Sequence, residues 1–541
     1  MTFDIIIKNG KIIDGTGNPG FYSDIGIKDG KISILGKIKK EDKTSKIIDA
    51  KGLTISPGFI DIHSHSDYTI PFEPLAPSSL HQGITTMVVG QCGASLAPVN
   101  PDKKELFDKE FSMAAPPGLE FNVTWTLFSE YLDEMEKLGC STNVAYLIGF
   151  GMVRLAAMGY EDRKPTDEEL QKMKDYINDA MEAGAFGIST GLIYTPQVYA
   201  KTEEVLEIAK EVAKHNGLYF SHIRNESEHV IEAIQEVIDI VEKSGCVGGQ
   251  IAHHKVAGKN NWGKSKDTLQ LIEETNKRGI SITCDQYPYN RGATGLISLL
   301  PPWTHEGGME KLIERLKDPK TKEKIRKDML EKPDYESFAK NSGWDCIYIA
   351  SLESEKWMPI IGKSIDEITK ELGRDDEFEV LCEIIIDEEA KVSMTIRSMN
   401  EEDISRIMKA RYTMAGTDGV AIPLTGPLAH GKPHPRYFGT YPRILGKYVR
   451  EEQLMPIEQA IRKMTSFPAQ RLGLFDRGIL RKGNWADIVI FNEETIIDKA
   501  TFLDPHQYPI GIEYVIVNGE IVIEKGKHLE NKPGKTLRKR K

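Results

Sequence analysis

The sequence predicts an α/β fold, a (β/α)8 barrel of the TIM type that carries a small discontinuous β-sandwich domain and an inserted subdomain. Three observations support this prediction. Eight short apolar runs between residues 59 and 418 alternate with segments of helical periodicity. Runs of β-branched residues with Asn-Gly and Asp-Gly turns stand near both ends of the chain. The length of 541 residues also exceeds what one hydrophobic core usually serves.

The β-sandwich domain is expected from residues 1–56 and 475–530. Both segments contain short runs rich in Ile and Val, separated by turns that favour type I′ geometry because both central residues need a positive φ. We expect the first segment to form a small antiparallel sheet that the second segment completes. The turns are Asn9-Gly10, Asp14-Gly15, Asp29-Gly30 and Asn518-Gly519.

Residues 57–474 are expected to form the barrel. Helical segments lie between several apolar runs: Thr166 and Glu169 make a capping box, and residues 230–241 carry an apolar stripe at helical spacing. Eight βα units in one run favour a closed barrel over an open sheet. The candidate strands are residues 59–63, 85–90, 143–149, 186–190, 218–222, 249–253, 281–285 and 412–418.

The interval between the seventh and eighth strands, residues 290–410, is too long for a structureless loop. It follows a barrel strand, so we expect an inserted subdomain that covers the active-site mouth as a lid. Residues 531–541 form a basic tail, which we expect to be a frayed, solvated end.

Composition limits the partners. The formal net charge of −11 argues against nucleic acid as the main partner. The N-terminal residues lack the pattern of a signal peptide, and no run reaches the roughly 18 apolar residues that cross a bilayer. The six cysteines are scattered, as in a reducing compartment. We therefore expect a cytoplasmic protein with a small-molecule substrate, no nucleic-acid or membrane partner, and a possible homo-oligomeric assembly.

Histidine and cysteine side chains follow several candidate strands. His63 and His65 end the first strand and point the same way, so they can share a metal ion. Cys92, His222 and His253 follow the second, fifth and sixth strands. Taken singly, a cysteine is often a small buried hydrophobe and a histidine is often only hydrogen-bonded. At the catalytic end of one barrel, a thiolate with imidazoles instead suits Zn²⁺.

Asp418 ends the eighth strand, within Gly416-Thr417-Asp418-Gly419. An Asp before Gly is also a common turn pair. Beside a metal, however, a carboxylate can accept the proton of a water nucleophile and later deliver it to a leaving amine. We expect this second role.

The motifs together resemble one family. Residues 57–67 resemble the first-strand signature of the amidohydrolase superfamily, and the whole set resembles its D-aminoacylase (N-acyl-D-amino-acid deacylase) branch over nearly the whole chain. The motifs are Pro57-Gly58-Phe59-Ile60-Asp61-Ile62-His63-Ser64-His65-Ser66-Asp67, Gly90-Gln91-Cys92-Gly93, Ser221-His222-Ile223-Arg224-Asn225-Glu226, Ala252-His253-His254-Lys255, Tyr287-Pro288-Tyr289, Gly416-Thr417-Asp418-Gly419, His434-Pro435-Arg436 and Gly483-Asn484-Trp485-Ala486-Asp487-Ile488-Val489.

The resemblance implies zinc-dependent hydrolysis of N-acyl-D-amino acids, with Asp418 as general base and acid. It implies one zinc held tightly by Cys92, His222 and His253. It also implies a second, weaker metal position at His63 and His65, which Cys92 can bridge. The residues implied to grip the substrate α-carboxylate are Lys255, Tyr287 and Arg436, whereas His254 is expected to point to the opposite face of its strand.

The sequence leaves room for different activities. Hydantoinases and dihydroorotases usually bridge two metals with a strand-four lysine, but residues 185–191 contain none, which counts against a cyclic-amide hydrolase. A dipeptidase acting on D-residues and a non-catalytic scaffold are also compatible with the fold. Ser66 stands where D-aminoacylases often have Asp, which bears on support of the weaker metal site. The apolar residues 295–300, despite nearby Arg291, favour neutral, hydrophobic D side chains.

Overall fold

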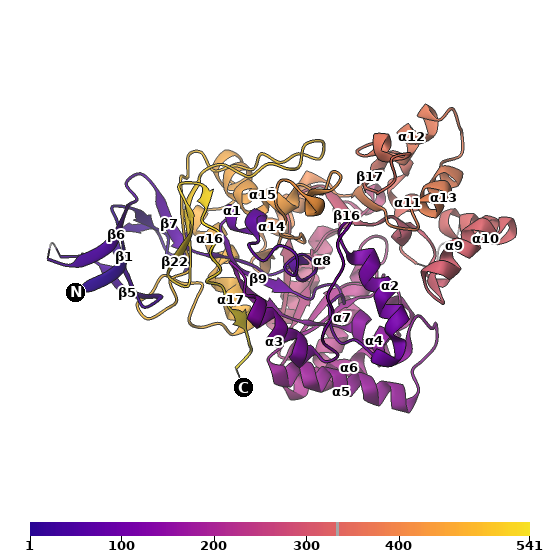
Figure 1. The fold of residues 1–541 in the computed structure, drawn as a ribbon, viewed down its shortest axis with the longest axis horizontal. Helices are drawn as coiled ribbons and strands as arrows, with labels where there is room; N and C mark the ends of the chain where they lie inside the picture. Colours follow the sequence, from indigo (N-terminus) through magenta and orange to yellow (C-terminus); the bar gives the residue numbers. More distant parts are fainter. Residues whose placement is uncertain (40, 332–334, 541) are drawn as a thin grey trace.

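The computed structural model describes residues 1–39, 41–331 and 335–540, and its central unit is the predicted parallel barrel (Figure 1). All eight predicted strands are present, and sequential neighbours pair in parallel. They are β8 (Phe59–Asp61), β9 (Ile84–Val89), β10 (Asn143–Tyr146) continued by β11 (Ile148–Gly149), β12 (Gly187–Gly191), β13 (Leu218–His222), β14 (Gly249–Ile251), β15 (Ile282–Gln286) and β19 (Thr413–Ala415).

The barrel closes between its eighth and first strands. Just beyond β19 and β8, the amide of Asp418 donates to the carbonyl of His63 at 2.8 Å, and the amide of His65 donates to Gly419 at 2.7 Å. At the seam between the third and fourth strands, the amide of Phe186 donates to Tyr146 at 2.9 Å. Closure therefore brings the histidine pair after the first strand and Asp418 after the eighth strand together.

Helices surround the barrel. The predicted capping box is present: Thr166 Oγ1 accepts from the amide of Glu169 at 3.2 Å, and Glu169 accepts from the amide of Thr166 at 2.8 Å. The outer helices include α1 (Pro77–His81), α2 (Lys104–Ala114), α3 (Phe128–Leu138), α4 (Phe150–Met158), α5 (Asp167–Ala183), α6 (Thr202–Lys214), α7 (Val230–Ser244), α8 (Ser265–Lys277), α14 (Glu401–Lys409), α15 (Arg436–Arg443), α16 (Ile457–Met464) and α17 (Ser466–Leu472). No helix among the described residues is long and apolar enough to cross a membrane.

Two sheets pack together at the end of the molecule that holds the N-terminus (Figure 1). One has the order β5-β4-β1-β6, and the other has the order β23-β22-β21-β20-β7-β2-β3. Isoleucines from both sheets, such as Ile5, Ile27, Ile488 and Ile516, share one core. Their strands are β1 (Thr2–Lys8), β2 (Lys11–Ile12), β3 (Phe21–Tyr22), β4 (Asp24–Lys28), β5 (Lys31–Gly36), β6 (Lys43–Asp49), β7 (Thr54–Pro57), β20 (Ile488–Phe491), β21 (Ile512–Val517), β22 (Glu520–Glu524) and β23 (Lys527–His528).

The expectation of a single antiparallel sheet from the first segment is wrong. Its strands are divided over both sheets, and β1 pairs in parallel with β6. Asn9-Gly10 closes no hairpin, because β1 and β2 lie in different sheets and need the bend between them. Asp29-Gly30 and Asn518-Gly519 do join antiparallel neighbours, with positive φ at all four residues.

The insertion between β15 and β19 has its own core and extends from the barrel on the side opposite the sandwich (Figure 1). Its elements are β16 (Arg291–Gly295), α9 (Met309–Lys317), α10 (Pro319–Leu330), α11 (Phe338–Ser342), β17 (Ile347–Ser351), α12 (Ile365–Glu371), α13 (Glu377–Asp387) and β18 (Ser393–Arg397), with β18 as the central strand of a three-stranded antiparallel sheet. The following helix α14 packs on α8 and β19 and thus on the barrel.

Residues 535–539 of the basic tail are held against the barrel, so for these residues the prediction of a frayed, solvated end is wrong. Strand β24 (Thr536–Leu537) adds in parallel to β10, and Leu537 packs against an apolar cluster of the barrel. Arg538 pairs with Asp133 at 2.6 Å and with Glu136 at 3.0 Å on α3. The residues that Leu537 and Arg538 contact lie far from the tail in the sequence. The composition of the tail alone therefore suggested disorder.

Candidate metal centre and active site

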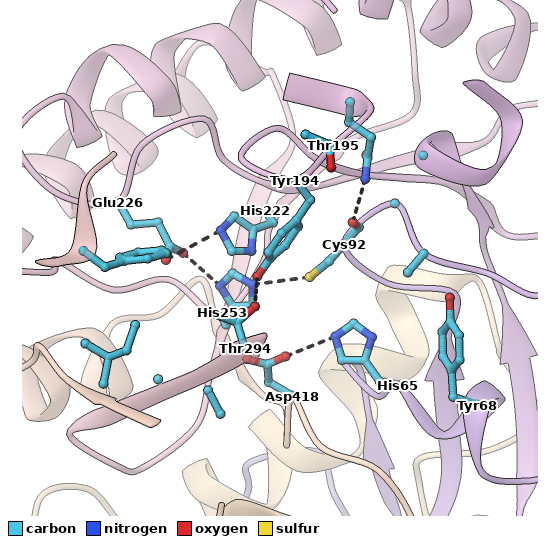
Figure 2. A pocket seen from close by; sticks show the side chains of 18 of the residues that line it. His65, Tyr68, Cys92, Tyr194, Thr195, His222, Glu226, His253, Thr294 and Asp418 are labelled. Carbon is cyan, nitrogen blue, oxygen red and sulfur yellow. Dashed lines mark hydrogen bonds and ion pairs between the residues drawn. The ribbon is translucent and has the colours of Figure 1, made fainter. Parts of the chain in front are cut away.

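The histidine, cysteine and aspartate side chains expected from the sequence converge at the carboxyl ends of the barrel strands. They border a cavity of about 370 Å³ whose lining includes His65, Cys92, His222, His253 and Asp418. Figure 2 shows these side chains turned toward one another. His63 is fully buried directly behind them.

A tight turn after β9 presents Cys92. Gly90 has φ +78°, and a Cβ there would lie 2.0 Å from the carbonyl oxygen of Leu147, so only glycine is accommodated. The Ser189 hydroxyl, on the fourth strand, accepts from the amide of Gly93 at 2.9 Å, and Gln197 donates to the carbonyl of Cys92 at 3.2 Å. The fourth strand, β12, contains no lysine and supports the cysteine turn through Ser189.

The metal-donor atoms form two overlapping groups. In the first, atoms of His63, Cys92, His253 and Asp418 all lie within 4.8 Å of one another; in the second, those of His222, Glu226 and His253 do so. Cys92 Sγ is 3.5 Å from His63 Nε2 and 3.4 Å from His253 Nε2. His253 thus belongs to both groups, and the spacing suits one or two closely spaced metal ions.

Carboxylates lie behind two of the imidazoles. Asp285 Oδ1 is 3.1 Å from His63 Nδ1 and also accepts from the amide of His253 at 2.7 Å. Glu226 Oε1 is 3.0 Å from His253 Nδ1. The carboxylate beside His63 Nδ1 orients that ring for metal binding through Nε2, as the outer partners of metal-binding histidines do. At His253, Nδ1 also faces Lys255 Nζ at 2.6 Å, so both Glu226 and Lys255 position that ring.

The electrostatics favour a thiolate at Cys92. Burial raises the pKa of the thiol, but the positive charges of His63 and His253 outweigh burial, and the pKa lies well below its usual range. His222 is also buried, burial lowers its pKa, and neither of its ring nitrogens has a hydrogen-bond partner among the described residues. Glu226 Oε2 lies 3.7 Å from His222 Nε2, beyond hydrogen-bond reach, so this buried imidazole is costly unless a ligand completes it.

Three of the converging residues have a strained backbone. Cys92, His253 and Asp418 have φ values of +53°, +32° and +49°. Non-glycine residues rarely adopt this region, and such strain persists where the surrounding structure enforces it, often at functional sites. These turns re-aim the side chains into the cavity as each strand ends.

Asp418 links the histidine pair to a cation. Its Oδ1 lies 3.2 Å from His65 Nε2 and 3.4 Å from His63 Nε2, and its Oδ2 lies 2.8 Å from Arg436 Nη1. Burial would raise the pKa of Asp418, but Arg436 and His253 hold it well below its usual range. The carboxylate is therefore ionised.

The three residues expected to hold a carboxylate lie together along the same cavity. Arg436 lies over the ring of Tyr287 at 4.6 Å, and Lys255 Nζ is 5.8 Å from that ring. The Tyr287 hydroxyl and Arg436 Nε have no hydrogen-bond partner within the described part of the chain. Lys255 is bound at 2.7 Å to Glu226.

Sequence reasoning missed two supporting acids. Glu226 stands four residues after His222, and Asp285 ends the predicted seventh strand just as Asp418 ends the predicted eighth. That strand-end position was a usable signal for Asp285. Glu226 gave a weaker signal, because its neighbours Lys255 and His253 come from the next strand.

Three smaller expectations have clear outcomes. His254 Nε2 pairs with Thr268 at 3.0 Å and does not line the cavity, as expected. Ser66 bonds Ser64 at 2.7 Å and accepts from the amide of Ala421 at 2.9 Å, so it supports the loops around His65. Arg291 stacks on Tyr348 and lies outside the cavity.

The apolar segment used to infer neutral D side chains does not line this cavity. Leu296, Leu299 and Leu300 are buried in the core of the insertion. These side chains therefore make no contact with the metal cavity itself, whereas Ile297 and Leu300 border a neighbouring space.

The chain is similar to known proteins over nearly its whole length. A model described as "Amidohydrolase family" matches residues 46–298 and 369–523. D-aminoacylase from Alcaligenes xylosoxydans xylosoxydans is 33% identical over 527 residues, covering 96% of this chain and 94% of that protein. N-acyl-D-glutamate deacylase from the same organism is 33% identical, covering 99% and 96%.

Solved structures show the same likeness. N-acyl-D-glutamate deacylase from Bordetella bronchiseptica, complexed with zinc and a phosphonate inhibitor, has a TM-score of 0.81 at 32% identity and covers 99% of this chain and 100% of that one. L-hydantoinase from Arthrobacter aurescens, with a TM-score of 0.57 at 16% identity and coverage of 99% and 100%, shares the fold alone. The chain belongs to the amidohydrolase family, in its D-aminoacylase branch.

Proposed function

We propose that this protein hydrolyses the amide bond of N-acyl-D-amino acids and releases a carboxylate and a free D-amino acid. One observation carries the proposal: a thiolate, several imidazoles and an ionised aspartate meet in a cavity that also holds Lys255, Tyr287 and Arg436. The relatives named D-aminoacylase and N-acyl-D-glutamate deacylase support this substrate class.

The donor set fits zinc. Cys92, His222 and His253 would hold the tighter ion, and His63 and His65 would hold a second one with Cys92. The unpartnered nitrogens of His222 and the orientation of the His63 and His253 Nε2 atoms toward Cys92 support this assignment. When bound, zinc supplies a Lewis acid that polarises the amide carbonyl and makes water more acidic.

Asp418 is the proposed proton carrier. Its Oδ1 faces the histidine pair at the cavity floor and Arg436 holds its Oδ2, so one oxygen has a fixed direction. The carboxylate accepts the proton of water as the oxygen attacks the carbonyl carbon, and it then protonates the amine nitrogen as the C–N bond breaks.

Lys255, Tyr287 and Arg436 are the proposed anchors of the α-carboxylate. Two cations and a phenol can hold a carboxylate in one orientation and so present the amide of a single enantiomer to Asp418. A cyclic-amide substrate is disfavoured, because the fourth strand β12 supplies Ser189 to the cysteine turn and contains no lysine.

Kinetics with a panel of N-acetyl-D- and N-acetyl-L-amino acids, run with metal analysis of the same preparation, test the proposal. We expect zinc and D-selective turnover. Asp418→Asn should keep zinc and lose about 10²–10⁴-fold in kcat. Asp133→Asn, at an exposed position of α3, is the matched control and should retain activity. Undiminished turnover of Asp418→Asn would overturn the assignment, and selectivity for L-substrates would overturn the substrate class.

A further inference from the structure

A second, larger chamber lies between the barrel and the insertion, with a volume of about 950 Å³. It adjoins the metal cavity, since Tyr160, Tyr194, Thr195 and Phe338 border both spaces. Its walls come from the loops after β12 and β13 and from residues 297–309 and 335–338 of the insertion.

Tyr194 is the partition between the two spaces. Its ring stands 5.0 Å from that of His222, and Thr294 donates to its hydroxyl at 3.2 Å. Figure 2 shows Tyr194 beside His222 and His253, with Thr195 next to it. A substrate group that passes this ring moves from the metal cavity directly into the chamber.

Most carboxylates that line the chamber have no ion-pair partner among the described residues. Its cationic side chains are Lys201 and Arg224, and Arg224 is already paired with Glu236 at 2.9 Å. The acidic residues of the lining that make no ion pair within the described residues are Glu110, Asp162, Glu203, Glu228, Glu232 and Glu336. Aromatic side chains such as Trp303 and Tyr199 complete walls that suit a cation with an aliphatic stem.

One of these acidic side chains, Glu336, is buried and not simply solvated. It is 4% exposed, and its Oε2 accepts from the amide of Glu226 at 2.8 Å, while its Oε1 has no hydrogen-bond partner among residues 1–39, 41–331 and 335–540. Burial and the charge of Glu226 raise its pKa to about 8, and the charge of Lys255 offsets only part of this increase. A buried acceptor of this kind is costly unless a ligand pairs with it.

We propose that this chamber binds a positively charged group of the substrate, with Glu336 as the principal contact. The inference rests on the proposed function and extends it to cationic N-acyl-D-amino acids. The cation can belong to the D side chain or to the acyl group, and both are protonated amines on a flexible stem. An ammonium placed at Glu336 Oε1 would complete that carboxylate and gain from the surrounding negative charge.

Two pairs of substrates separate these sources. N-acetyl-D-lysine is compared with N-acetyl-D-2-aminoheptanoate, and N-(6-aminohexanoyl)-D-alanine is compared with N-heptanoyl-D-alanine. Within each pair a methyl group replaces the ammonium group. We expect the cationic member of one pair to have a kcat/KM about tenfold higher. The pair that shows the preference identifies the source, and no preference in either pair overturns the inference.

Variants then locate the contact. Glu336→Gln keeps an oxygen for the amide of Glu226 and should reduce the cationic preference about tenfold, and Glu232→Gln should reduce it less. Glu314→Gln, on the exposed face of the insertion, is the control and should keep the wild-type ratio. If both Glu336→Gln and Glu232→Gln kept the wild-type preference for the cationic substrate, the assignment to this chamber would be overturned.

The two proposals fail in different ways. Turnover of the neutral substrates without a cationic preference leaves the deacylase proposal intact and overturns only this inference. Absence of turnover with every substrate overturns the deacylase proposal. In that event, calorimetry of N-acetyl-D-lysine and its methyl isostere on the zinc-loaded protein decides the chamber's role, and equal affinities would overturn it.

Discussion

Replacing Glu226 by Gln tests whether the metal-donor set depends on the carboxylate behind it. Glu226 is 4% exposed, and its Oε1 lies 2.7 Å from Lys255 Nζ and 3.0 Å from His253 Nδ1. Burial alone would raise its pKa, but Lys255, His222 and His253 outweigh burial and hold the pKa well below its usual range. The charge of Glu226 is therefore integral to this cluster.

The expected loss of stability follows from the charge of Lys255, which stays buried in the variant. Removing one partner of a buried ion pair typically costs about 3–5 kcal/mol, because the other charge stays buried. The Gln amide oxygen can still accept from Lys255, so we expect the lower end, about 3 kcal/mol. Loss of the carboxylate beside a ligating histidine should also weaken zinc binding by about 10–100-fold.

Chelator competition measures the zinc affinity, and thermal unfolding of the metal-free protein measures the stability. Glu204→Gln is the matched control, because it removes the partner of the buried Arg154 at 3.0 Å, away from the metal-donor atoms. It should lower the unfolding temperature without changing zinc affinity. Wild-type zinc affinity in Glu226→Gln, or an equal loss in Glu204→Gln, would refute the reasoning.

Three further predictions concern packing and burial. Gly90→Ala should lower the unfolding temperature and the zinc content measured by metal analysis, because its Cβ would clash with Leu147; an unchanged zinc content would contradict this. Deleting residues 535–541 should lower the unfolding temperature, because β24 and the Arg538 pairs are lost; an unchanged temperature would show that the tail contributes nothing. Burial lowers the pKa of Lys463 to about 8, so the folded state binds fewer protons than the unfolded state between about pH 8 and 10. In urea titrations, the free energy of unfolding of the wild type should rise relative to that of Lys463→Met by up to about 3 kcal/mol as the pH rises through this window. A difference that stays constant with pH would contradict the burial argument.

The barrel was predictable because its signal is local. Each strand is a short apolar run, and helical periodicity separates the runs, so the strand ends were identified without knowing their partners. Residues at strand ends converge in any closed parallel barrel, which brought His63, Cys92, His222, His253 and Asp418 to one cavity.

The features that the sequence did not predict depend on contacts between distant segments. The sandwich strands carry the right turns, yet the pairing of β1 with β6 is decided by which isoleucine faces share a core. Glu336 belongs to the insertion, and only the folded chain shows that it meets the amide of Glu226. The surroundings of residues 295–300 were unpredictable for the same reason, because Leu296 and Leu299 pack in the core of the insertion and no local pattern reveals that.

Barrel closure and site assembly are one event in this chain. The hydrogen bonds from the amides of Asp418 and His65 join the eighth strand to the first, and the same residues carry the proposed base and a proposed metal ligand. Asp61 strengthens this seam: it accepts from the amide and hydroxyl of Thr417 at 2.8 and 2.6 Å and from the amide of His63 at 3.2 Å. A change that loosens the seam must therefore move the proton carrier relative to the histidine pair. At Asp418, the hydrogen bonds of this seam also hold the positive φ of +49° that directs the side chain into the cavity.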